Sequence, residues 1–191
     1  MESSYFSDPI IFLLDTVFSF YILAVLLRFI LQWVGGDFNN PISQFLIKIT
    51  HPPLRLLRRY IPSIGKVDTS SLVLLVSLQM VSDLIVLSVK GMSFSIAALI
   101  LLSLSQLISL LFNVFVFAIF ARAILSWINP GTFNEATKIL FNLTEPLLSA
   151  CRRIIPDIGG IDLAPLIVLL GLQLAKMLIM PPLQQLITLV N

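Results

Sequence analysis

Two stretches of the 191-residue chain decide the fold: RFILQWVGGDFNNPISQFLIKITHPPLRLLRRYIPSIGKVD at residues 28–68, and RAILSWINPGTFNEATKILFNLTEPLLSACRRIIPDIGGID at residues 122–162. A shift of 94 residues aligns them without a gap, and the alignment extends to Gln79 and Gln173, over 52 positions of which 20 are identical. Chance matches in an apolar chain would be scattered Leu and Ile, whereas Trp, Arg, Pro, Asp and Gln recur here in register. The chain therefore contains an internal duplication.

The composition indicates an integral membrane protein. Hydrophobic residues make up 58% of the chain, charged residues 12%, and the mean hydropathy is +1.01. Soluble domains carry about 45–50% apolar and about 25% charged residues. The formal net charge of +2 is too small to indicate a nucleic-acid partner. The N-terminal residues carry no positive charge of the kind that begins a secretory signal, so we expect the first apolar stretch to be retained as a membrane span.

Four stretches are long enough to cross a hydrocarbon core of about 30 Å as helices. The expected spans are residues 9–33, 70–89, 103–127 and 163–180. The third stretch does not fit a single span, because the apolar run from Ser93 to Trp127 is too long for one straight crossing. We expect an interfacial or tilted piece at 93–102 before this span. The alternative is two spans there, five in all.

Basic residues predict the orientation, because they collect on the cytoplasmic side of a membrane. Five lie between the first two spans, namely Lys48, Arg55, Arg58, Arg59 and Lys66. Three lie between the last two, namely Lys138, Arg152 and Arg153. Both segments, which we call the connectors, should therefore be cytoplasmic, with the N- and C-termini on the outer side.

Each unit reads span, connector, span, so the two copies should insert in the same orientation. The predicted fold is all-α and polytopic. It has a first repeat over 9–90, a second over 93–181, and a C-terminal tail over 182–191. Each connector should be amphipathic. In the first connector Pro52 and Pro53 should break the helix.

The duplicated residues also form a motif, R-x-I-L-x-W followed by T-x-P-x-x-x-x-x-R-R-x-I-P-x-I-G-x-[VI]-D, at residues 28–68 and 122–162. This motif resembles the YggT family of bacterial membrane proteins, which carry two such units. The resemblance implies a multi-pass plasma-membrane protein without settled biochemistry. Relatives have been connected with osmotic tolerance, potassium homeostasis, cell division and nucleoid distribution, and chloroplast relatives with haem attachment. The second copy departs from the first at three positions, where Pro41, His51 and Ser71 are replaced by Glu135, Glu145 and Pro165.

Two charged pairs recur in the duplication. Arg28 and Arg122 lie five residues before Trp33 and Trp127, and Asp68 and Asp162 begin the return spans on the same side. An unpaired arginine inside a bilayer is costly, although one near a helix end can extend to the interface. We expect Arg28 to pair with Asp68, and Arg122 with Asp162. The competing role of each aspartate is to cap its helix, and one carboxylate can do both. The alternative for these four residues is that they line a substrate route.

The basic residues of the connectors are candidates for binding. Arg55, Arg58 and Arg59 in the first connector, and Arg152 and Arg153 in the second, could bind anionic phospholipid headgroups or an acidic partner. The alternative is that they only enforce topology.

A third group of polar residues lies within the spans: Asp15, Gln79, Asp83, Gln173 and Lys176. Gln79 and Gln173 are expected near the midplane, where they would bond between helices or line a small polar site. Asp83 and Lys176 occupy similar depths in equivalent spans, and we expect them to form an ion pair. Asp15 and Asn113 could join the same cluster.

No catalytic residues, metal ligands or cofactor are predicted, since the single histidine and the single cysteine are unmatched between the copies. The leading interpretation is a non-catalytic scaffold, assembly or regulatory protein. It would bind phospholipid, a membrane-protein partner or a second copy of itself through the basic connectors. The alternative is a subunit of a channel or transporter that handles potassium or protons, because ionisable groups within a membrane often mark pathways.

Overall fold

The computed structural model describes residues 3–65, 67–128, 134–154 and 162–190, and within these ranges it is built from α-helices. Their bounds are α1 Ser3–Trp33, α2 Pro41–Leu57, α3 Thr69–Val89, α4 Ile96–Ile128, α5 Glu135–Ile154 and α6 Ala164–Val190. Four helices are long and apolar enough to cross a membrane, over Asp8–Trp33, Thr69–Val89, Ile96–Ser126 and Ala164–Val190. The prediction of an all-α protein with four spans is confirmed.

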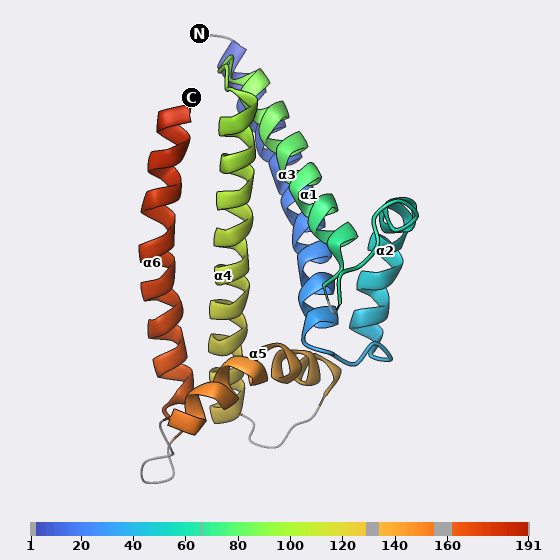
Figure 1. Ribbon diagram of the computed structural model, residues 1–191, viewed down its shortest axis with the longest axis vertical. Helices are drawn as coiled ribbons and strands as arrows, with labels where there is room; N and C mark the ends of the chain where they lie inside the picture. Colours follow the sequence, from blue (N-terminus) through green and yellow to red (C-terminus); the bar gives the residue numbers. More distant parts are fainter. Residues whose placement is uncertain (1–2, 66, 129–133, 155–161, 191) are drawn as a thin grey trace.

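The two repeats run in the same direction, as predicted. In Figure 1, α1 and α4 begin at the end of the molecule where α6 finishes, and both run toward the opposite end. We call that part of the molecule, toward which α1 and α4 run and from which α3 and α6 return, the connector end. Of the two amphipathic helices, α5 lies across its tip, and α2 lies nearer mid-height (Figure 1).

The spans form a row in which each packs on the next. Helix α1 packs against α3, α3 against α4, and α4 against α6. The main apolar core joins the two repeats through side chains of five helices: Ile22, Val25, Leu26 and Ile30 of α1, Leu54 of α2, Leu74 and Leu75 of α3, Phe115 and Ala118 of α4, and Leu143 of α5. A separate cluster of Ile119, Leu148 and Ala164 links α4 and α5 to α6.

Helix α4 differs from the expected division of its apolar stretch. It runs without a break from Ile96 to Ile128, so 96–102 belongs to the same helix as the rest, and the two-span alternative is wrong. The helix contains neither Gly nor Pro, and Ala98 and Leu99 near its start are buried. At about 1.5 Å per residue the candidate span is about 46 Å long, which exceeds the hydrocarbon thickness.

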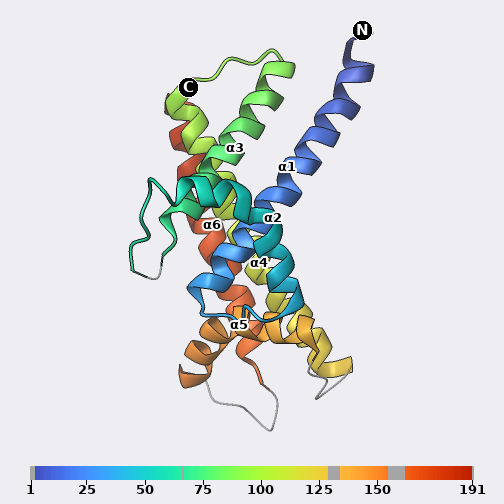
Figure 2. The ribbon, with the colours of Figure 1, turned by 90° about the vertical axis from the view of Figure 1, so that its right-hand side faces the viewer.

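Prolines interrupt the helices less than the sequence suggests. Helix α2 continues through Pro52 and Pro53 to Leu57, although Figure 2 shows it changing direction partway along, as prolines that remove backbone donors cause. Helix α6 continues through Pro181 and Pro182, so residues 182–190 of the expected tail are helical. Helix α6 packs against α4. The Ser95 hydroxyl also donates to the Val190 carbonyl at 2.9 Å.

The N-termini of the two amphipathic helices meet. Asn40 caps α2, because its side-chain oxygen accepts from the Ile42 backbone at 2.8 Å, and its side-chain nitrogen donates to the Glu135 carbonyl of α5 at 2.7 Å. This buried amide therefore ties one repeat to the other.

Replacing Asn40 separates these two functions. Asn40→Ser keeps an oxygen for the cap but loses the donor to Glu135, and should lower the free energy of unfolding by about 1 kcal/mol. Asn40→Ala loses both and should cost about 1 kcal/mol more. Thermal unfolding of the purified protein in detergent measures the two steps. Equal midpoints for both variants would show that the cap contributes nothing.

Candidate functional site

The two buried arginines of α1 and α4 are bonded to the connectors. Arg28 is 6% exposed and donates from Nη1 to the Thr50 hydroxyl of α2 at 2.7 Å. Arg122 is 8% exposed and donates from Nη1 to Thr144 of α5 at 2.8 Å. Each threonine hydroxyl gives its own proton to the carbonyl four residues earlier, which leaves its oxygen to accept from the arginine. The Thr of the T-x-P motif is thus the polar partner of the buried arginine in both copies.

The predicted ion pairs of Arg28 with Asp68 and of Arg122 with Asp162 are wrong. Asp68 forms its ion pair with Arg58, and Asp162 pairs with Arg152 at 2.7 Å. Among the described residues, no ion pair joins Arg28 to Asp68 or Arg122 to Asp162. The reason is local: each aspartate lies only ten residues after an arginine at the end of the same connector, while the buried arginine already has a threonine.

Asp68 is the N-cap of α3, as predicted, whereas Asp162 lies two residues before the start of α6 and accepts from its first backbone N–H. Asp68 accepts from the Ser71 backbone at 3.4 Å and from its hydroxyl at 2.8 Å, and Asp162 accepts from the Ala164 backbone at 2.9 Å. Burial raises the pKa of Asp68, but the hydrogen bonds from Arg58 and Ser71 and the charge of Arg58 outweigh it, so the pKa is lowered. The pKa of Asp162 is also lowered, because hydrogen bonds from Arg152 and Ala164 and the charge of Arg152 outweigh burial.

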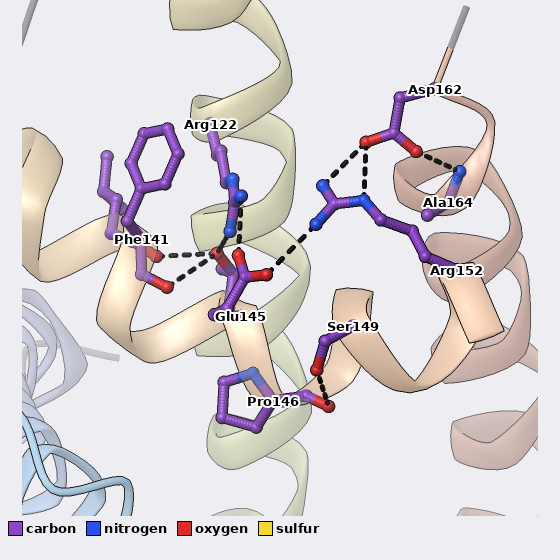
Figure 3. A network of polar contacts seen from close by, with 10 residues as sticks. Arg122, Phe141, Glu145, Pro146, Ser149, Arg152, Asp162 and Ala164 are labelled. Carbon is purple, nitrogen blue, oxygen red and sulfur yellow. Dashed lines mark hydrogen bonds and ion pairs between the residues drawn. The ribbon is translucent and has the colours of Figure 1, made fainter. Parts of the chain in front are cut away.

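In the second repeat a glutamate joins these elements into one network (Figure 3). Glu145 accepts from Arg122 at 2.8 Å and from Arg152 at 3.1 Å, and Arg152 continues to Asp162. The Arg122 guanidinium also lies 4.0 Å from the centre of the Phe141 ring. The sequence showed Glu145 as a departure from the first copy, but did not identify it as a bridge between two arginines.

In the first repeat the corresponding region contains a pocket of about 630 Å³. Arg28, Arg58 and Asp68 contribute its charged groups, and Phe38 and Ile47 contribute apolar surface. The pocket is formed by α1, by α2 and the loops on either side of it, and by the cap of α3.

The arginines predicted to bind partners fall into two groups. Arg58 and Arg152 are held by the aspartates that cap the return spans. Arg55, Arg59 and Arg153 are exposed, and their side chains form no hydrogen bond or ion pair with the described part of the chain. The Arg59 guanidinium lies 5.9 Å from the Tyr60 ring centre.

The intramembrane pair of Asp83 and Lys176 is not formed. Asp83 of α3 accepts from Ser103 of α4 at 2.7 Å, whereas Lys176 of α6 donates to Asn113 of α4 at 2.7 Å. The two residues lie at related depths, but α4 stands between α3 and α6 in the row and gives each a separate partner.

The two glutamines also have different environments. Gln79 donates to Gln106 of α4 and, at 3.2 Å, to Asp83, so it bonds between helices as expected. Gln173 is exposed and does not meet Gln79. Asp15 is exposed on α1 and lies outside the contacts that Asp83 and Lys176 form. Gln106 and Ser103 of α4 are the polar partners of Gln79 and Asp83 in α3, and neither was predicted from the sequence.

The fold and the duplicated network define a class: four-span membrane proteins built from two parallel repeats, each with an amphipathic connector. The family model described as CCB3/YggT matches the chain twice, over residues 7–89 and 101–183. The chain belongs to the CCB3/YggT family, as the motif predicts.

Several bacterial proteins are similar over most of this chain. A protein of Pseudomonas aeruginosa described as uncharacterized is 42% identical over 171 residues, 88% of this chain and 87% of its own length. A Vibrio alginolyticus protein described by its place in the proC 3' region is 40% identical over 87% of this chain and 91% of its own. YggT of Escherichia coli K12 is 36% identical over 89% of this chain and 88% of its own. No solved structure matches the chain significantly.

The Asp68 cap yields a prediction with a defined pH dependence. Because the pKa of Asp68 is lowered in the folded chain, its charge stabilises the fold above the ordinary aspartate pKa of about 3.9, and this contribution is lost as the pH falls through the lower folded value. Asp68→Asn keeps a capping oxygen but removes the charge, and should cost about 1 kcal/mol at pH 7, since Arg58 is partly exposed.

Unfolding of both proteins in detergent should be compared between pH 7 and pH 3. The difference between them should shrink toward zero below pH 4. The exposed Asp8 provides the control, and Asp8→Asn should match the wild type throughout. If the difference in stability between the wild type and Asp68→Asn stays constant down to pH 3, the effect comes from the change in side-chain shape and not from the charge.

Proposed function

We propose that this protein is a non-catalytic scaffold or assembly protein of the membrane, which acts through its two connectors. The observation that carries the proposal is the attachment of both connector helices to their spans by the buried Arg28–Thr50 and Arg122–Thr144 bonds. These bonds fix the orientation of α2 and α5. A binding surface held in this way loses little conformational entropy when a partner associates.

The chemistry of this surface favours an acidic partner. Arg55, Arg59 and Arg153 remain exposed after the aspartates have engaged the other two arginines. The Asn40–Glu135 bond brings the beginnings of α2 and α5 together, so the two connectors can act on one partner. An acidic segment of another membrane protein fits this arrangement. The family resemblance connects the process served with osmotic tolerance or the cell envelope.

We further propose that the protein lies in a bacterial plasma membrane with its connector end in the cytoplasm and both termini outside. The clustering of basic residues in the connectors supports this orientation.

Single cysteines test the orientation on a Cys151→Ser background. Ser63 lies at the connector end and Ser93 in the turn between α3 and α4, and both are exposed. A membrane-impermeant maleimide added to intact cells should label Ser93→Cys and leave Ser63→Cys unlabelled until the cells are opened. Labelling of Ser63→Cys from outside would reverse the proposed orientation.

The scaffold function is tested by neutralising the exposed arginines together. Arg55→Gln, Arg59→Gln and Arg153→Gln combined should reduce co-purification of partners from native membranes at least tenfold, because each loses a charge available to an acidic surface. The matched control is Lys90→Gln, which is exposed outside the connectors and should leave recovery unchanged. Quantitative mass spectrometry after affinity purification provides the measurement.

The ion-handling alternative draws less support from the described residues, because Asp83 and Lys176 are hydrogen-bonded on different sides of α4. Potassium or proton flux into proteoliposomes containing the purified protein, abolished by Asp83→Asn, would favour this alternative. Unchanged partner recovery in the triple arginine variant would contradict the scaffold directly.

A further inference from the structure

The two repeats differ at the centre of their connector networks. The position of Glu145, which bridges two arginines in the second repeat, is taken by His51 in the first. The His51 side chain is exposed and does not line the pocket that contains Arg28 and Arg58. Phe141, whose ring packs on the Arg122 guanidinium, is replaced by Ile47, which lines that pocket. The first repeat thus lacks both groups that cover the buried arginine of the second.

The charges of the two networks differ accordingly. In the second repeat, Arg122 and Arg152 are balanced by Glu145 and Asp162. In the first repeat, Arg28 and Arg58 face Asp68 alone, which leaves an excess of one positive charge.

The buried arginine of the first repeat has donors to spare. Arg28 uses Nη1 for Thr50 and, at 3.5 Å, for the Ile47 carbonyl, while Nη2 and Nε donate to no described residue. Every fully buried side-chain nitrogen or oxygen in the described ranges has a hydrogen-bond partner. The unused donors of Arg28 are therefore not fully buried, and Arg28 lines the pocket. Arg58, at the C-cap of α2, lines the same pocket.

We propose that this pocket binds a phosphate group, which bridges Arg28 and Arg58 in the place that the Glu145 carboxylate occupies between Arg122 and Arg152. A phosphodiester carries a single negative charge, which equals the excess in the pocket, and arginine binds phosphate oxygens through paired N–H donors. The inference rests on the comparison of the two repeats and is independent of the exposed arginines proposed to bind a partner.

The position of the pocket favours a phospholipid headgroup as the source. Arg28 lies five residues before Trp33, which is exposed at the end of α1, where aromatic side chains mark the headgroup level of a bilayer. Phe38 and Ile47 give the pocket an apolar wall. Soluble phosphate has the same oxyanion chemistry, and the experiment distinguishes the two sources.

The test exchanges the residues that distinguish the repeats. Purified full-length protein in detergent should be titrated with dioleoyl phosphatidylglycerol, with dioleoylglycerol, which lacks the phosphate, and with inorganic phosphate. Native mass spectrometry counts the bound molecules, and the rise in unfolding temperature reports affinity. The wild type should bind one phosphatidylglycerol per chain and discriminate at least tenfold against dioleoylglycerol. Inorganic phosphate should compete if the source is soluble and fail to compete if it is lipid, and both results support a phosphate site.

His51→Glu supplies the internal carboxylate of the second repeat and should weaken phosphatidylglycerol binding at least tenfold, whereas His51→Gln, its neutral control, should bind like the wild type. Glu145→Gln combined with Phe141→Ile removes both groups that cover Arg122 and should raise the number of bound molecules from one to two. Equal binding of dioleoylglycerol and phosphatidylglycerol, or wild-type affinity in a folded His51→Glu variant, would overturn the proposal. Should His51→Glu fail to fold, the discrimination by the wild type decides.

Discussion

A guanidinium group that is removed from water must have its charge and its hydrogen bonds satisfied by the protein, and this requirement organises the connector end. Arg28 and Arg122 are almost completely buried, and an unsatisfied charge at that depth would cost several kcal/mol. A threonine from an amphipathic helix supplies one of the required acceptors in each repeat. Since the threonine must reach the arginine, the helix that carries it has to lie against the span. The Arg–Thr bond therefore positions α2 and α5, and with them every basic residue that they present.

The second layer of polar contacts serves the return spans. Asp68 and Asp162 supply acceptors to the free backbone donors at the beginnings of α3 and α6, and each draws an arginine from the end of its own connector. The connector is consequently attached at two places, by its threonine to the incoming span and by its arginine to the outgoing one. Such double attachment gives the shared threonine and the shared arginine of each connector a common structural role.

Much of this fold could be predicted from the sequence, because its signals are periodic or additive. Apolar length gives the spans, and the gapless repeat predicts parallel copies. Lateral neighbours could not be predicted in the same way. Depth along a helix places Asp83 and Lys176 at a similar level, but the row in which α4 separates α3 from α6 depends on packing between distant segments. Both Arg28 and Arg58 are possible partners of Asp68 in the sequence. Asp68 pairs with Arg58 because Arg28 is already bonded to Thr50. The helix breaks expected from prolines are not found, because neighbouring helices support a helix that proline alone would interrupt.

The duplication separates what the fold requires from what each copy adds. Residues shared by both repeats are the arginine, the threonine, the second arginine and the capping aspartate, and together they leave an excess of one positive charge in each connector network. The second copy removes this excess internally with Glu145 and covers Arg122 with Phe141. The first copy does neither, although its arginine is equally buried. Since the shared residues alone suffice to hold the connector, the uncompensated charge of the first copy is not a structural necessity of the unit. It is the place where the two halves of an otherwise repeated scaffold have become chemically different.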